Sequence, residues 1–82
     1  MDVAGTLVEA LGGSDNIIDV EPCLMRIRAT VVDPLAVDEE AIRSTNPLAV
    51  VRSGNYVQII IGVDATDLAQ QMNVVRPATV SQ

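Results

Sequence analysis

The chain has 82 residues, with five arginines, no lysine, no histidine and one cysteine, and its formal net charge is −6. This length fits one small domain, the absence of histidine excludes a Ser-His-Asp triad, and a single cysteine excludes an internal disulfide and a structural Cys/His zinc site. The acidic balance disfavours nucleic acid and anionic membrane surfaces as partners, and no segment approaches the roughly 20 apolar residues that cross a bilayer.

The first half of the chain is predicted to form a helix followed by two strands. Apolar residues recur at helical spacing over 3–11, which indicates a helix with one buried face. A short strand is expected over 16–20, and an interruption is expected over 21–24 because proline removes a backbone donor there. A second strand over 25–32 follows closely, which predicts an antiparallel hairpin with Cys23 at its tip.

Period-two alternation divides the second strand between two faces of the sheet. One face is apolar, and its residues are Met25, Ile27, Ala29 and Val31. The other face is polar and holds Arg26, Arg28 and Thr30. We expect the aliphatic residues to be buried beneath helices.

The second half of the chain is predicted to form a helix, two strands and a last helix. Acidic residues at the start of 39–44 favour a short helix there. Two strands are expected over 48–52 and 56–61, joined by a tight turn that contains glycine. A last helix is expected over 64–72, and 73–82 shows no period and is interpreted as a tail or linker.

The order α-β-β-α-β-β-α predicts the fold class. Strands that come in hairpin pairs, with helices between the pairs, favour α+β over a doubly wound parallel sheet. We expect one four-stranded antiparallel sheet with helices packed on one face. The folded domain is expected to span 1–72, with 73–82 outside it.

The most informative segment is the one around the single cysteine. Arg26 and Arg28 follow Cys23 and project from one strand face, so both guanidinium groups are expected near the hairpin tip. Cationic neighbours favour the nucleophilic thiolate form of cysteine, and arginine clamps phosphoryl oxygens in bidentate geometry. This pattern favours reception of an anionic group, phosphate first. A buried structural cysteine and a solvated sheet face with two arginines remain alternative interpretations.

Several short motifs occur in the order and spacing of one bacterial family. They are Leu11-Gly12-Gly13, Asn16-Ile17, Cys23-x-x-Arg26-x-Arg28, Asp33-Pro34, Val37-Asp38-Glu39 and the run from Val50 to Gly62. On these motifs, over about residues 4–72, the chain resembles the enzyme IIB (EIIB) domain, type 1, of the glucose/N-acetylglucosamine family of the bacterial phosphoenolpyruvate-dependent sugar phosphotransferase system.

The resemblance implies a phosphocarrier that belongs to a sugar permease. Cys23 would accept a phosphoryl group from a phosphohistidine of a IIA protein or domain and pass it to a sugar, of glucose or N-acetylglucosamine type, held by the membrane IIC domain. Arg26 and Arg28 match family arginines that stabilise the phosphoryl group, and Gln58 matches a glutamine beside the phosphorylated cysteine. No metal or other cofactor is expected. The implied location is cytoplasmic, at the inner face of the membrane through IIC.

Further predictions concern the residues next to Cys23. Backbone N–H groups of Leu24 and Met25 are expected to bind phosphate as a small nest, and their side chains to form an apolar rim where IIA docks. Met25 stands where the family usually has threonine, and Pro22 where small or acidic residues are common. These departures motivate one alternative, a non-catalytic EIIB-like module that binds a regulator or a permease. An α+β interaction domain with a buried cysteine is the other.

Overall fold

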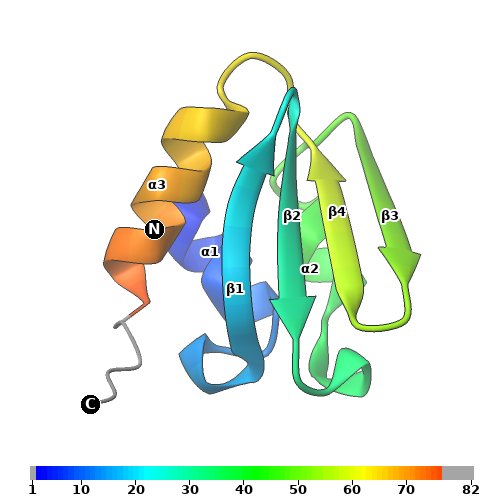
Figure 1. Cartoon of the computed structure of the whole chain (residues 1–82). Helices are drawn as coiled ribbons and strands as arrows, with labels where there is room; N and C mark the ends of the chain where they lie inside the picture. The colour runs from blue at the N-terminus through cyan, green and yellow to red at the C-terminus, as the bar shows by residue number, and fades with distance from the viewer. Residues whose placement is uncertain (1, 77–82) are drawn as a thin grey trace.

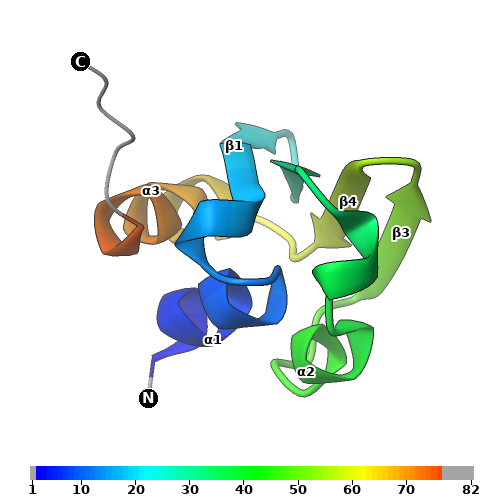
Figure 2. The same ribbon diagram turned by 90° about the horizontal axis from the view of Figure 1, so that it is seen from below.

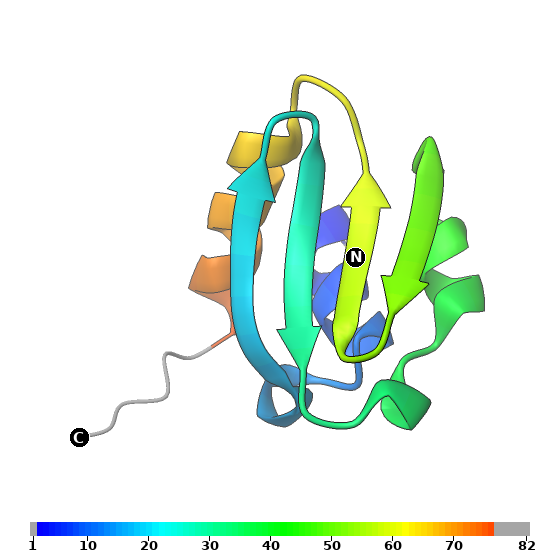
Figure 3. The ribbon, with the colours of Figure 1, turned by 45° about the vertical axis from the view of Figure 1, so that its right-hand side comes forward.

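The chain folds into one open antiparallel sheet, with its helices against a single face (Figure 1 and Figure 3). This computed structural model describes residues 2–76. Its elements in chain order are α1 (Val3–Ala10), a 3-10 turn (Ser14–Asn16), β1 (Ile17–Cys23), β2 (Arg26–Val31), a 3-10 turn (Pro34–Ala36), α2 (Glu39–Arg43), β3 (Ala49–Ser53), β4 (Tyr56–Ile60) and α3 (Ala65–Val75). The predicted α+β class with a four-stranded antiparallel sheet is confirmed.

The strand order is β1-β2-β4-β3, so the two hairpins join where β2 pairs with β4. In that pairing Arg28 lies opposite Gln58. The two residues are far apart in the chain, and neither hairpin alone would bring them together. The pairing of β2 with β4 therefore brings Gln58 next to the arginines that follow the first hairpin tip.

The helices lie on one side of the sheet (Figure 2). Alternate residues of the sheet face them and form the core with them. The sheet contributes Val20, Ile27, Ala29, Val31, Val57 and Ile59, and the helices contribute Leu7, Ile42, Ala69 and Met72 among others. Met25, which was expected on the buried face, is instead 56% exposed. It lies in the turn that follows β1, where the alternation of a strand no longer applies.

The first strand is longer than the sequence pattern predicts. β1 continues through Pro22 to Cys23, so the expected interruption over 21–24 is wrong. Pro22 pairs with Ile27 in the hairpin. Because β1 is an edge strand, it tolerates a proline whose nitrogen faces away from the partner strand. The strand therefore carries Cys23 out to the end of the hairpin.

The last helix, α3, also runs beyond its expected end and stops at Val75. The Asn73 side-chain amide donates a hydrogen bond to the Val20 carbonyl at 3.0 Å, which fastens the final turns of α3 to β1. Of the expected tail 73–82, residues 77–82 lie outside the described residues. Within the described part of the chain, no helix combines the length and apolar character needed to cross a membrane.

A buried asparagine joins the end of α1 to both strands of the first hairpin. Asn16 is 7% exposed, and its amide nitrogen donates to the carbonyls of Leu11 (2.8 Å) and Asp33 (3.0 Å). Its amide oxygen accepts from the Asp33 N–H at 2.9 Å. Gly12 packs so closely here that a Cβ would lie 2.6 Å from the Asn16 amide nitrogen. This cluster fixes where the hairpin starts relative to the helix layer.

We expect Asn16→Ala to lower the free energy of unfolding by about 2–3 kcal/mol, because three hydrogen bonds are lost and buried or partly buried backbone groups lose their partners. Asn73→Ala is the matched control, since Asn73 is exposed, donates one bond to the Val20 carbonyl and accepts one exposed bond from Arg76. That variant should lose about 1 kcal/mol or less. Urea denaturation followed by circular dichroism measures both, and equal losses would contradict the role given to Asn16.

Candidate functional site

Cys23 occupies the end of β1, at the tip of the first hairpin (Figure 1). Its side chain is exposed, so the alternative of a buried structural cysteine is wrong. The two-residue turn Leu24–Met25 follows it, and Arg26 begins β2 directly opposite. The only thiol of the chain is therefore presented to the outside by a short, closed hairpin.

The open face of the sheet arranges the charged residues around the thiol. Cys23 pairs with Arg26 across the hairpin, and Glu21 pairs with Arg28. Residues two apart on a strand point to the same face, so these four side chains form two adjacent cross-strand pairs. Both arginines lie on the face that no helix covers, as the alternation of β2 predicts.

Gln58 of β4 extends this arrangement to a third strand. The Arg26 guanidinium donates a hydrogen bond from Nη1 to Oε1 of Gln58 at 2.7 Å. This contact orients the guanidinium that lies opposite Cys23. The sequence singled out both residues, but their direct hydrogen bond depends on the β2–β4 pairing.

Arg28 is held by two residues that the sequence analysis did not single out. Its Nη2 lies 3.5 Å from Oε2 of Glu21, and its guanidinium carbon lies 5.8 Å from the centre of the Tyr56 ring. Both contacts are within the range of an ion pair and a cation–π interaction. Two signals were available: Glu21 stands two residues before Cys23, and Tyr56 is the only aromatic residue of the chain.

The hairpin tip leaves backbone donors available beside the thiol. Within residues 2–76, no group accepts a hydrogen bond from the N–H of Leu24 or of Met25. The Met25 carbonyl accepts from the N–H groups of Ile61 and Gly62, each at 2.9 Å, which ties the tip to the segment after β4 (Figure 3). The segment after β4 therefore anchors the hairpin tip through the Met25 carbonyl, and the N–H groups of Leu24 and Met25 stay available to an external acceptor.

Leu24 adopts a left-handed backbone conformation, with φ at +59°, and its side chain is 86% exposed. A non-glycine residue pays roughly 1–2 kcal/mol for that conformation. Such strain is often found at sites where a protein acts, since the surrounding structure must enforce it. The turn beside Cys23 is thus kept in one defined shape.

Replacing Leu24 by glycine should raise the free energy of unfolding by about 0.5 kcal/mol, because the relief of strain exceeds the extra entropy of the unfolded chain. Met25→Gly is the matched control, because Met25 has no positive φ to relieve. It should destabilise the protein slightly. Thermal unfolding of both variants measures the difference, and a loss of stability in Leu24→Gly would argue against strain at this turn.

The second hairpin closes with the turn that the sequence predicts. Gly54 has φ at +57°, and the Asn55 amide nitrogen donates to the carbonyls of Val31 (2.8 Å) and Val32 (3.0 Å). These bonds fasten the turn to the end of β2. Gly54 and Asn55 therefore serve the fold at a distance from Cys23, at the opposite end of the sheet (Figure 1).

A second group of charges lies on the helix side, away from the thiol. The Arg43 guanidinium donates hydrogen bonds to the Glu39 carboxylate, at 2.8 Å for Nη2, and Arg52 lies 3.6 Å from the same carboxylate. The hydrogen bond from Arg43 holds the pKa of Glu39 below its usual range, although desolvation acts in the opposite direction. This cluster links α2 to β3 and contributes nothing to the surface around Cys23.

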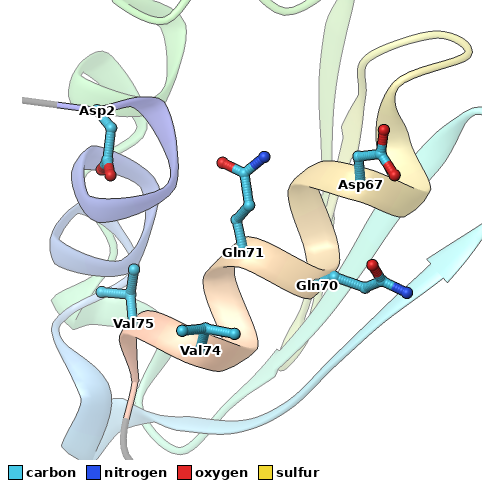
Figure 4. Close-up of a pocket in the computed structure, with 6 residues that line it drawn as sticks. All are labelled: Asp2, Asp67, Gln70, Gln71, Val74 and Val75. Atoms are coloured by element: carbon cyan, nitrogen blue, oxygen red, sulfur yellow. The ribbon is translucent and has the colours of Figure 1, made fainter.

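Two surface grooves lie away from Cys23. One of about 390 Å³ runs between the start of α1 and α3, and its walls are Asp2, Asp67, Gln70, Gln71, Val74 and Val75 (Figure 4). Another of about 660 Å³ adjoins it, and neither groove includes a residue of the first hairpin. Within residues 2–76, no three potential metal ligands come together. Cys23 is therefore exposed outside both grooves.

Comparisons with known proteins agree with the fold and show which family the chain resembles. The family model of the phosphotransferase system EIIB matches residues 6–38. The N-acetylglucosamine-specific EIIB component of Streptomyces coelicolor is 39% identical over 69 residues, which cover 84% of this chain and 90% of that protein. The maltose-specific EIICB component of Bacillus subtilis is 36% identical over 87% of this chain, but the match spans only 14% of that longer protein.

A solved structure of a phosphotransferase-system domain has a similar fold. The crystal structure of one domain of the phosphotransferase-system IIabc component from Clostridium difficile matches with a TM-score of 0.69 at 25% identity, over 88% of this chain and 73% of that one. The sequence match over 90% of an EIIB component and the shared fold point to the same relationship. This chain belongs to the EIIB family of the sugar phosphotransferase system.

Proposed function

We propose that this EIIB chain carries a phosphoryl group on Cys23, which receives it from a phosphohistidine of a IIA partner and gives it to a sugar held by a IIC partner. The observation that carries this proposal is the position of the thiol, exposed at a hairpin tip directly opposite Arg26 and beside the pair of Glu21 and Arg28. An exposed thiol with fixed cations next to it is the arrangement that a transferable dianion requires.

Reception of the group is a displacement at phosphorus. The Cys23 thiol loses its proton to water, and the thiolate sulfur attacks the phosphorus of the partner's phosphohistidine. A P–S bond forms while the P–N bond breaks, and its electron pair stays on the imidazole nitrogen. In the onward step a sugar hydroxyl oxygen attacks phosphorus, the P–S bond breaks, and its electron pair returns to sulfur. The hydroxyl proton leaves to a base of the IIC partner or to water.

The neighbours of Cys23 have distinct roles in this scheme. Arg26, oriented by Gln58, and Arg28 donate to the phosphoryl oxygens and neutralise charge that shifts during transfer. The N–H groups of Leu24 and Met25 bind the remaining oxygens as a small nest. Because fixed cations and backbone dipoles supply the electrostatic stabilisation, the reaction requires no metal ion from this chain.

The relatives support a IIC partner for this chain. The maltose-specific and N-acetylglucosamine-specific proteins of Bacillus subtilis are EIICB components, in which an EIIB unit is joined to EIIC. We infer that this chain works with a IIC permease domain at the inner face of the membrane, in the cytoplasm. The sugar is of the glucose or N-acetylglucosamine type, as in the Streptomyces coelicolor relative that is named for N-acetylglucosamine.

Direct labelling tests the proposal. The 82-residue chain is mixed with a phosphorylated glucose-family IIA protein, and the products are examined by intact-mass and peptide mass spectrometry at neutral pH. One added phosphate on the peptide that contains Cys23 is the expected result. If the chain stays unlabelled while a known EIIB protein is labelled in parallel, the proposal is wrong, and the alternative of a non-catalytic binding module replaces it.

A further inference from the structure

We propose that Glu21 is a positioning residue, which holds Arg28 in an ion pair while Cys23 is unphosphorylated and competes for Arg28 once the phosphoryl group is present. Glu21 would thereby limit how tightly the group is held and keep it transferable. This inference rests on the proposed phosphocarrier function. It concerns a residue that does not itself contact the phosphoryl group.

The geometry of the hairpin supports a competition for one guanidinium. Glu21 and Arg28 are direct cross-strand partners, and their charged atoms lie 3.5 Å apart. Cys23 is two residues further along the same strand face, roughly 7 Å away at the usual rise of a strand. Arg28 is diagonal to Cys23, and a long side chain spans that diagonal. One guanidinium therefore has two anionic partners within reach after phosphorylation.

Tyr56 contacts the Arg28 guanidinium from the side away from Cys23, because Tyr56 pairs with Thr30, further from the hairpin tip. The guanidinium lies over the ring at 5.8 Å from its centre, and about half of each side chain is exposed. A cation–π contact of this kind does not require a single hydrogen-bond direction, so it tolerates a shift of the planar group. Arg26 is different, because its hydrogen bond to Gln58 ties it to one acceptor.

The charges around Cys23 indicate how Glu21 changes the free energy of the phosphorylated state. In the thiol state, Glu21 neutralises Arg28, and the two residues form a matched pair. When a dianion is attached to Cys23, Glu21 becomes a nearby like charge and shares Arg28 with it. Both effects raise the free energy of the phosphorylated state relative to the free state. A carrier benefits from this, since a group bound too tightly is not passed on.

The site provides a close control for this role. Asp19 also lies on β1, two residues before Glu21, and its cross-strand partner is Thr30 instead of an arginine. Other charged groups facing the thiol are Arg26 and Arg28 themselves. Asp19→Asn and Glu21→Gln thus remove the same charge from the same strand, but only Glu21→Gln releases Arg28.

The first measurement is the equilibrium between phosphorylated IIA and this chain. Glu21→Gln should shift it toward phosphorylated Cys23 by about two- to five-fold, the range expected for one exposed ion pair. Phosphorus NMR should also show a lower second pKa for the phosphoryl group, because a neighbouring negative charge is gone. Asp19→Asn should leave the equilibrium within error of the wild type, and Glu21→Asp, which keeps the charge, should restore it.

A double-mutant cycle shows whether Glu21 acts through Arg28. In an Arg28→Gln background, Glu21→Gln should shift the equilibrium less than in the wild type, because only the direct repulsion between Glu21 and the phosphoryl group is then removed. A full shift in that background, an equal shift in Asp19→Asn, or no shift at all would each overturn the proposal.

One readout is independent of phosphorylation. In the unphosphorylated protein, the Arg28 guanidinium NMR signals should move in Glu21→Gln and stay in place in Asp19→Asn. If they move while the wild type takes up no phosphoryl group, the ion pair is real but the proposed function is wrong, and the competition falls with it. If the wild type is labelled and the signals do not move, the inference alone is overturned.

Discussion

Cys23→Ser is expected to abolish labelling of this chain by phosphorylated IIA, a loss of at least about 10³-fold in the rate of phosphoryl uptake. The labelling is lost because a serine hydroxyl is a much weaker nucleophile than a cysteine thiol. A thiol supplies a few per cent of thiolate at neutral pH, whereas a serine hydroxyl remains protonated without a general base. The chain has no histidine to act as that base, so the oxygen cannot replace the sulfur. Intact-mass spectrometry after mixing with phosphorylated IIA measures the loss.

The substitution is informative because it leaves the fold untouched. Cys23 is exposed and takes no part in the core, so Cys23→Ser should change the free energy of unfolding by about 0.5 kcal/mol or less. Ser53→Ala, at an exposed position on β3, is a suitable control that should be labelled like the wild type. Labelling of the Cys23→Ser protein at the wild-type rate would remove Cys23 from the reaction.

Arg28→Ala and Arg26→Ala are each expected to slow phosphorylation of the sugar by about 10²-fold or more, because each removes a fixed donor aimed at the charge that shifts during transfer. The two variants should differ in detail. Loss of Arg26 also leaves Gln58 without its hydrogen bond, whereas loss of Arg28 leaves Glu21 as an unpaired anion near the phosphoryl group. Sugar phosphorylation in membranes that contain the IIC permease, with phosphorylated IIA as donor, measures both.

Arg43→Ala is the matched control, since it removes the same charge from α2, where Arg43 pairs with Glu39 away from Cys23. It should keep the wild-type rate of sugar phosphorylation. Arg26→Lys separates charge from geometry: lysine keeps the charge but lacks the planar fork, so a partial loss is expected. Full rates in both alanine variants, or an equal loss in Arg43→Ala, would show that the local cations have no special role.

The sequence predicted the elements well where local physics decides them. Hydrophobic periodicity located α1 and α3, and alternation along β2 separated Ile27, Ala29 and Val31 from the residues of the open face. These features follow from the residues of one segment, so they are readable without the rest of the chain. Segment ends were less accurate: β1 runs through Pro22, because an edge strand tolerates a proline that an isolated pattern reads as a break.

Some residues of the site could be identified from the sequence, and others only from the fold. The spacing of Cys23, Arg26 and Arg28 places them at one hairpin tip, and family motifs pointed to Gln58. Glu21 stands two residues before Cys23 and Tyr56 is the only aromatic residue of the chain, but neither signal identifies the residue that it contacts. Their shared partner is Arg28, and only the register of β1 with β2 and of β2 with β4 reveals it.

The composition of the chain, with one thiol, five arginines, no histidine and a net negative charge, determined what chemistry it can contain. It limits the nucleophile to one residue and the cations to a few, and local spacing places two of those cations beside the thiol. The tertiary structure decided whether the thiol is exposed, which strand lies next to β2, and how each arginine is held. Composition and spacing act along the chain, whereas burial and strand order depend on packing between segments that are distant in sequence. The thiol and its cations are therefore readable from the sequence, and the contacts that orient Arg26 and Arg28 are properties of the folded sheet.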